Sequence, residues 1–148
     1  VGFHSTRLFA MGDARGNNIY GDNNNETGYA PYCLFTDKPN TPGLADAWNS
    51  LYIVVTQADY IINDYAPQGR QHFSEAQANA CEGEARFMRA AAYYYLASYW
   101  HDVPIMENPI AHTEAFNMAP TRFEDVIRYG IRDLEYAVRL WDYWHAIM

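Results

Sequence analysis

The sequence is poor in basic residues and has no long apolar run, and each deficit excludes a class of partner. Lysine occurs once, at Lys38, and Lys and Arg together number 10 against 18 Asp and Glu, for a net charge of −8. Nucleic-acid binding needs clustered positive charge, so this balance argues against it, as it does against docking on anionic lipid. No run of about 18 apolar residues occurs, so no segment is predicted to span a bilayer.

Cysteine is also scarce. Cys33 and Cys81 allow at most one disulfide, form no metal-binding spacing, and leave the redox compartment open. The chain begins Val1-Gly2-Phe3, with no initiator Met and no signal-peptide pattern. We therefore expect either that a targeting segment has been removed or that the chain is a piece of a longer protein.

Motifs for catalysis and metal binding are absent. There is no GxSxG, no HExxH and no glycine-rich phosphate loop, and the five His residues are dispersed. Asp22, Asn24 and Glu26 alternate as in a calcium loop, but Thr27 stands where an EF-hand needs glycine. We predict no catalytic residue, no metal site and no cofactor. Acid–base chemistry by an unpaired set of carboxylates stays open as a weaker alternative.

The sequence is rich in apolar and aromatic residues. They make up 49% and 16% of its 148 residues, and 13 of the aromatic residues are Tyr. Residues 11–43 are rich in Gly, Pro and Asn, which favour turns, and they also carry Tyr and Phe. A loop of this length in a compact domain is usually functional or disordered, and its aromatic residues favour order and use. We predict a functional loop over residues 11–43.

Helical periodicity follows this loop and predicts helices over about residues 44–66, 74–100 and 122–141. One face of the first helix is formed by Leu44, Trp48, Leu51, Val55, Ala58, Ile62 and Tyr65. Pro67 should end this helix, and Ser74/Gln77 and Thr121/Glu124 have the spacing of capping boxes. The run from Ala90 to Tyr95 is apolar nearly all round, so we expect the middle helix to be covered on two sides. The predicted fold is all-α, with antiparallel helix hairpins.

Three blocks of this helical part resemble the SusD/RagB proteins. The block Glu84-Ala85-Arg86-Phe87-Met88-Arg89-Ala90, with Tyr94 and Leu96, followed by His101-Asp102-Val103-Pro104-Ile105, is similar to their "EaRFLRA…Y…L…GDVPL" stretch. Upstream, Trp48-Asn49-Ser50-Leu51-Tyr52 with Ile53 and Ala58 resembles their Trp–Tyr helix. Downstream, Asp125-Val126-Ile127, Ile131, Asp133-Leu134, Ala137 and Leu140 resemble the following helix. The sequence departs from the family at His101, usually Gly, and at Asp59, usually Asn.

The resemblance implies properties that composition does not. SusD/RagB proteins are Bacteroidetes outer-membrane lipoproteins that face the cell exterior and carry tetratricopeptide-like helix pairs. They cover a SusC-like TonB-dependent transporter, capture glycans or peptides for import, and are binders rather than enzymes. The chain would then be the N-terminal part of such a protein, residues 1–148. Its only membrane attachment would be a lipid anchor upstream of Val1, which is neither Cys33 nor Cys81.

Glycan binding needs flat aromatic faces and planar polar groups. The 11–43 loop offers both, and the predicted ligand-binding residues are Tyr20, Tyr29, Tyr32, Asp13, Arg15, Asn17 and Asp22, with Asn18 beside them. Tyr20 and Tyr29, which flank the Asn23–Asn25 run, are the strongest candidates, although the tyrosines could instead anchor the loop to the helices.

The remaining aromatic and charged motifs have structural interpretations. We predict core positions for Trp48 and for Tyr93, Tyr94, Tyr95, Tyr99 and Trp100, and a structural ion-pair cluster for Arg86 and Arg89 with Glu82 and Glu84. Two rival functions remain. A helical scaffold that binds only protein predicts a hydrophobic groove and no sugar affinity, and a hydrolase predicts turnover and two facing carboxylates.

Overall fold

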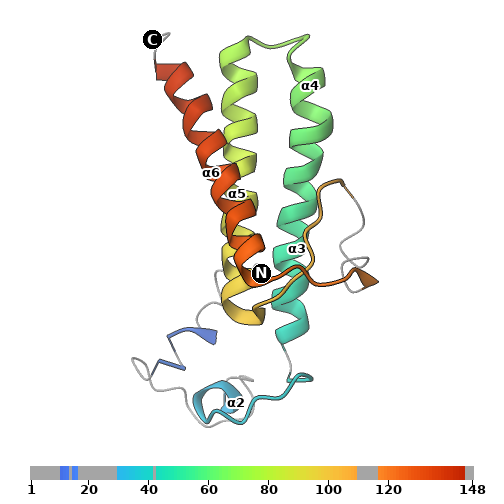
Figure 1. The fold of residues 1–148 in the computed structure, drawn as a ribbon, viewed down its shortest axis with the longest axis vertical. Helices are drawn as coiled ribbons and strands as arrows, with labels where there is room; N and C mark the ends of the chain where they lie inside the picture. Colours follow the sequence, from blue (N-terminus) through green and yellow to red (C-terminus); the bar gives the residue numbers. More distant parts are fainter. Residues whose placement is uncertain (1–10, 14, 17–29, 42, 110–116, 146–148) are drawn as a thin grey trace. The chain divides into compact units, whose positions relative to one another are not determined.

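The computed structural model describes residues 11–13, 15–16, 30–41, 43–109 and 117–145, without the side chains of 141–145. Within these ranges the chain is helical and contains no strand, which confirms the predicted all-α fold (Figure 1). The only extended pairing among the described residues is an isolated antiparallel bridge between Val103 and Thr121. Two compact units divide the chain, Val1–Ser50 and Leu51–Met148.

The first unit contains a short helix, α2 (Ala30–Cys33), inside the segment predicted as a loop. Its two buried residues are Ala30 and Tyr32. The helix ends in the two backbone bonds of a Schellman motif, from Thr36 N–H to Pro31 C=O at 2.9 Å and from Phe35 N–H to Tyr32 C=O at 3.4 Å. This motif places Phe35 at a left-handed φ of 54°, where a glycine is usual.

Helix α3 (Leu44–Tyr60) continues into a π-helical turn, η3 (Ile61–Tyr65), and then into a last turn, α4 (Ala66–Gly69). The helical path therefore runs past Pro67, which was expected to end it. Pro67 lies in the first turn of α4, directly after the π-helical turn, a place where the i→i−4 hydrogen-bond ladder is already interrupted.

Helix α5 (Glu75–Trp100) begins at the predicted capping box. The Ser74 hydroxyl accepts from the Gln77 N–H at 3.3 Å, and the Gln77 side-chain oxygen accepts from the Ser74 N–H at 3.1 Å. This helix is covered on two sides, as expected, by α6 (Phe123–His145) on one flank and by η3 and α4 on the other, while its outward side is exposed. Tyr93 is fully buried, but Phe87, Met88 and Tyr94 are exposed.

Helix α6 (Phe123–His145) lies beside α5 (Figure 1). The approach is close at Gly130, where a Cβ atom would meet the Ala90 carbonyl oxygen at 3.7 Å. The predicted capping box at Thr121 and Glu124 is wrong. The Phe123 N–H instead donates to the Asp102 carboxylate at 2.9 Å, while the Thr121 backbone forms both hydrogen bonds of the bridge to Val103.

The segment that follows α5 is fastened to the other helices by the Asp-Val-Pro motif and its neighbours. The Tyr52 hydroxyl of α3 donates to the Pro104 carbonyl at 2.7 Å. The Tyr93 hydroxyl of α5 accepts from the Met106 N–H at 2.7 Å. With Asp102 at the start of α6, this motif joins three helices.

Candidate functional site

The described part of the 11–43 segment brings an aromatic ring, a guanidinium and a carboxylate together in the first unit. Arg15 Nη1 donates to Asp37 Oδ2 at 3.1 Å, and the Arg15 guanidinium lies 5.1 Å from the centre of the Phe35 ring. Phe35 is 64% exposed. An exposed ring beside paired charges offers an apolar face for a sugar ring and polar groups for its hydroxyls.

The Schellman motif at the end of α2 explains why Phe35 projects. A non-glycine residue at positive φ is costly and is often found where geometry serves a function. The turn that holds Phe35 in this conformation also brings Thr36 and Asp37 round toward Arg15, as the Arg15–Asp37 bond shows.

The structure describes three of the predicted ligand-binding residues and not the others. Asp13 is exposed, Arg15 is half-buried in its pair with Asp37, and Tyr32 is only 2% exposed. The remaining candidates, Tyr20, Tyr29, Asn17, Asn18 and Asp22, lie outside the described residues. The role of all of them toward a ligand stays a prediction.

Sequence reasoning left Phe35 and Asp37 out of the candidate set. Both lie in the predicted functional loop, and Asp37 has the charge that complements Arg15. Arg15 and Asp37 are 22 positions apart in the sequence, so no short motif or residue spacing predicts that they pair. Phe35 has a left-handed backbone conformation. A phenylalanine in the sequence gives no reason to expect that conformation, so its exposure could not be predicted.

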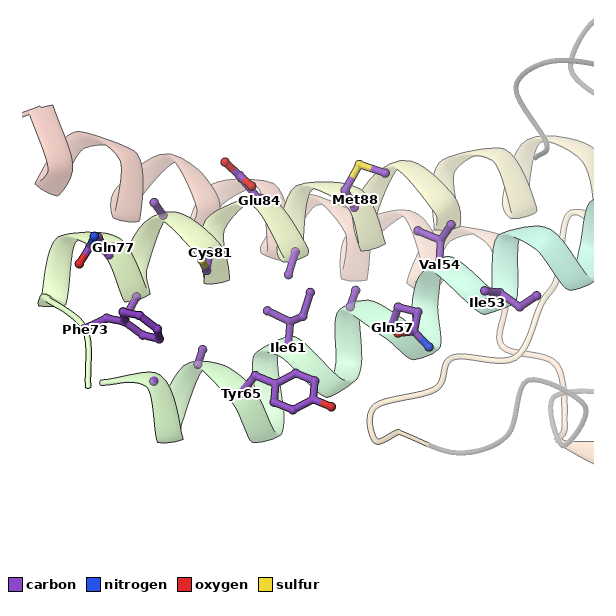
Figure 2. A pocket seen from close by; sticks show the side chains of 16 residues that line it. Ile53, Val54, Gln57, Ile61, Tyr65, Phe73, Gln77, Cys81, Glu84 and Met88 are labelled. Atoms are coloured by element: carbon purple, nitrogen blue, oxygen red, sulfur yellow. The ribbon is translucent and has the colours of Figure 1, made fainter. Parts of the chain in front are cut away.

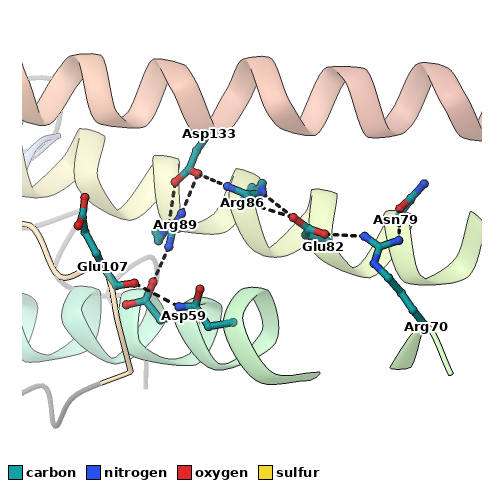
Figure 3. A network of polar contacts seen from close by, with 9 residues as sticks. Asp59, Arg70, Asn79, Glu82, Arg86, Arg89, Glu107 and Asp133 are labelled. Carbon is teal, nitrogen blue, oxygen red and sulfur yellow. Dashed lines mark hydrogen bonds and ion pairs between the residues drawn. The ribbon is translucent and has the colours of Figure 1, made fainter. Parts of the chain in front are cut away.

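A second set of polar groups forms a chain of ion pairs in the unit Leu51–Met148 (Figure 3). Arg89, which is buried, bonds Asp59 of α3 through Nη1 and Asp133 of α6 through Nε and Nη2, the latter two at 2.7 and 2.8 Å. One guanidinium therefore joins three helices.

The chain continues along α5 beyond Asp133. Arg86 donates to Asp133 at 3.0 Å and to Glu82 at 2.8 Å, and Arg70 donates to Glu82 at 2.8 Å and to Asn79 at 2.6 Å. These contacts agree with the predicted structural role of Arg86, Arg89 and Glu82. Glu84, the fourth predicted member, is exposed and takes no part in these bonds.

Burial raises the pKa of Asp59 to about 6, although the hydrogen bond and charge of Arg89 act in the opposite direction. Its Oδ2 atom has no hydrogen-bond partner among the described residues, which agrees with a carboxylate that is poorly solvated. Arg89 keeps its charge, because its hydrogen bonds to Asp133 and Asp59 outweigh the effect of burial and raise its pKa. The charged Arg89 and its two carboxylate partners thus have a structural role, which is to hold α3, α5 and α6 together.

The described residues also bear on two other kinds of site, a metal site and a membrane-spanning helix. In the part of the chain that the structure describes, no three His, Cys, Asp or Glu residues lie where they could hold a metal ion. No described helix is long and apolar enough to cross a membrane. Cys33 and Cys81 are free thiols.

Comparison with known proteins shows the family. The model of the family SusD-like_3, described as "Starch-binding associating with outer membrane", matches residues 9–140. A SusD-like protein of Bacteroides ovatus is 32% identical over 136 residues, which are 92% of this chain and 24% of that protein. The chain belongs to the SusD-like family.

A second relative, the SusD-like protein P25 of Formosa agariphila, is 27% identical over 94 residues, which are 64% of this chain and 18% of that protein. No solved structure gives a significant match. The chain thus spans about a quarter or less of the length of these relatives. At the level of the family, SusD-like proteins are binding proteins associated with the outer membrane.

Proposed function

We propose that the chain is the N-terminal helical part of a cell-surface lipoprotein that binds glycan, or another nutrient oligomer such as a peptide. The bound oligomer would be delivered to a SusC-like TonB-dependent transporter. The observation that carries the proposal is the family match over residues 9–140. The protein acts as a binder and not as an enzyme, and the membrane is reached through a lipid anchor upstream of Val1.

Binding is reversible and non-covalent in this proposal. The apolar face of a sugar ring stacks on an exposed aromatic ring, and its hydroxyls bond to carboxylate, amide and guanidinium groups. Phe35, Arg15 and Asp37 supply one such group of side chains. Tyr20 and Tyr29, in the same segment, are proposed to extend it.

Neighbouring residues of the loop provide a matched test of ring stacking. Phe35 and Leu34 are 64% and 56% exposed, but only Phe35 has a flat ring. In affinity gel electrophoresis of the complete protein on polysaccharide, Phe35→Ala should reduce retardation and Leu34→Ala should leave it unchanged. Tyr20→Ala and Tyr29→Ala should also reduce it. Equal retardation of all variants and the parent would place the site outside this loop.

Two further results decide between this proposal and its rivals. If no polysaccharide or peptide pool retains the complete protein, the nutrient-binding proposal fails and the protein-binding scaffold is favoured, since the structure has the apolar groove that a scaffold predicts (Figure 2). Release of shortened oligosaccharides would favour a hydrolase instead.

Delivery to a transporter is tested separately. A gene for a TonB-dependent transporter should lie beside the gene for this chain. The two products should co-purify from outer membranes, with the transporter contacting the helical part. Absence of both the gene and the complex would contradict delivery while leaving glycan binding intact.

A further inference from the structure

A polar groove in the unit Leu51–Met148 contains two arginines that have no carboxylate partner among the described residues. The groove is lined by residues of η3, α5 and α6, with Glu107 from the segment after α5, and its volume is about 570 Å³. Three of the lining residues, Arg86, Arg89 and Glu107, are shown in Figure 3. Ligand pockets commonly measure about 300–1,000 Å³, so this space is large enough for a sugar unit.

This groove continues along α6 into a second polar groove. Glu107, Tyr129 and Arg132 line both, and Asn108 and Arg128 line the second. The two therefore form one elongated surface, called here the arginine groove. On α6 it is bordered by Asp125, Arg128, Tyr129, Arg132, Tyr136 and Arg139. The spacings of three and four place these residues on one side of the helix, and a surface of this length suits an oligomer.

The two unpaired arginines are Arg132 and Arg139. Every other described arginine takes part in an ion pair. Among the described side chains Glu135 pairs with neither, although it stands three positions after Arg132 and four before Arg139, where ion pairs on a helix form readily. Arg139 Nε instead donates to the Glu135 backbone carbonyl at 3.3 Å. In a chain of net charge −8, two such cations in one groove favour a ligand that brings its own negative charge.

Tyrosine rings contact both of these arginines. The Arg132 guanidinium lies 5.3 Å from the centre of the Tyr129 ring, and the Arg139 guanidinium lies 5.5 Å from the centre of the Tyr136 ring. A cation–π contact holds the charge without a carboxylate. Arg132 is exposed, and among the described residues its N–H groups have no oxygen to bond. They can therefore bind an oxyanion in the planar, two-pronged manner of a guanidinium.

Carboxylates in the same groove narrow the class of ligand. Glu107 is exposed and lines both parts of the groove, and Glu135 is exposed and lines the first. These side chains repel a simple inorganic anion but accept hydrogen bonds from hydroxyl groups. A ligand that satisfies both kinds of side chain carries an anionic group for the arginines and hydroxyl groups for the glutamates. Acidic sugars carry both.

We propose that the arginine groove binds an acidic oligosaccharide, which carries uronate or sulfate ester groups. This inference rests on the proposed function, since it names the chemical class of the bound oligomer. Arg132 and Arg139 bind the oxyanion, and Glu107 accepts from neighbouring hydroxyls. Because the charges of the groove are exposed, binding should weaken as the salt concentration rises.

Polysaccharides that differ only in charge test the class of ligand. Polygalacturonate and alginate supply uronates, carrageenan and dextran sulfate supply sulfate esters, and each is compared with its methyl-esterified or desulfated form. In surface plasmon resonance on the immobilised polysaccharides, the complete protein should bind at least one acidic form about tenfold or more tightly than its neutral form. Preference for the uronates or for the sulfate esters identifies which anion the groove accepts.

Substitutions with a matched control locate the binding. Arg132→Gln and Arg139→Gln should each weaken binding of the acidic polysaccharide at least about tenfold. Arg122 is the control, because its side chain is 78% exposed and borders neither part of the groove. Arg122→Gln removes the same charge and should weaken binding less than about twofold. Arg132→Lys, which keeps the charge without the planar donors, should fall between them. Arg132 and Arg139 are exposed, so circular dichroism should show folded variants.

Three outcomes would overturn the inference. They are acidic polysaccharides that bind no more tightly than their neutral forms, equal losses in Arg122→Gln and Arg132→Gln, and binding through Arg132 to poly-glutamate but to no polysaccharide. A protein that binds only neutral polysaccharides would reject this inference and leave the proposed function standing. A protein that binds no polysaccharide or peptide pool would reject both.

Discussion

His101 is held in a backbone conformation that favours glycine. It ends α5 at φ 67° and ψ −96°, and its ring stacks on Phe123 with centres 4.8 Å apart. We expect His101→Gly to raise the free energy of unfolding by about 1 kcal/mol, because strain is relieved at the cost of a weak stack. His101→Ala should lower it, since strain persists and the stack is lost. Thermal unfolding of both variants checks this, and an Ala variant at least as stable as the Gly variant would contradict it.

Asp59 should make stability depend on pH. Its pKa in the folded protein is about 6, against about 4 for an unfolded Asp. Between these values the folded state keeps a proton that the unfolded state has released, so stability falls as pH rises through this window.

Comparison of the parent with Asp59→Asn isolates this effect. The difference in unfolding free energy should shift in favour of the variant by up to roughly 2 kcal/mol from pH 4 to pH 6 and then level off. Urea unfolding at several pH values measures it. A difference that is constant with pH would show that Arg89 keeps the carboxylate ionised throughout.

The buried ion pairs of Arg89 should contribute more to the free energy of unfolding than an exposed ion pair does. Arg89→Leu leaves Asp59 buried without its cation and leaves Asp133 with Arg86 alone, and loss of one partner of a buried pair costs about 3–5 kcal/mol. Arg128→Leu, which breaks an exposed pair with Asp125, should cost no more than about 0.5 kcal/mol. Denaturant unfolding of the two variants should show this difference, and equal losses would mean that the network contributes no more than a surface pair.

At the scale of elements, the packing of α5 against α6 depends on Gly130. Its missing Cβ would lie 3.7 Å from the Ala90 carbonyl oxygen, an ordinary contact, so Gly130→Ala should be neutral or stabilise by up to about 1 kcal/mol through reduced freedom of the unfolded chain. Gly130→Leu should destabilise by about 1–3 kcal/mol, because the helices must separate. Melting temperatures distinguish the two, and a Leu variant as stable as the Ala variant would refute the close approach.

Helix positions could be predicted where their cause is local. The 3.6-residue period and the Ser74 capping box are properties of neighbouring residues, and both are present in the structure. The start of α6 was predicted to within about one residue, but its cap could not be, because the carboxylate that accepts from Phe123 N–H is Asp102, 21 positions away. The π-helical turn at Ile61–Tyr65, which lets the path continue past Pro67, also has no signal in the spacing of apolar residues.

At the scale of the whole molecule, the candidate site could be predicted only in part. Composition marked residues 11–43 as a candidate ligand-binding loop, and Arg15 within it does meet an aromatic ring and a carboxylate. The aromatic ring that Arg15 contacts is that of Phe35, whose position depends on its left-handed backbone. Tyr32, a predicted ligand-binding residue, is instead buried. The expectation that Tyr94 packs was wrong for the described residues for a related reason. Periodicity marks an apolar face but does not say which part of the chain covers it.

The bridge between Val103 and Thr121 has a consequence for how this family can vary. Its two hydrogen bonds, at 3.0 and 3.1 Å, tie both ends of the intervening stretch, and the neighbouring Asp102 and Pro104 bond to the start of α6 and to α3. Because closure entropy grows only with the logarithm of length, residues inserted between these ties would disturb the three helices little. Because Met106 inside these ties is buried and its N–H bonds the Tyr93 hydroxyl, the positions between Met106 and Thr121 are where a change of length should cost the helical scaffold least.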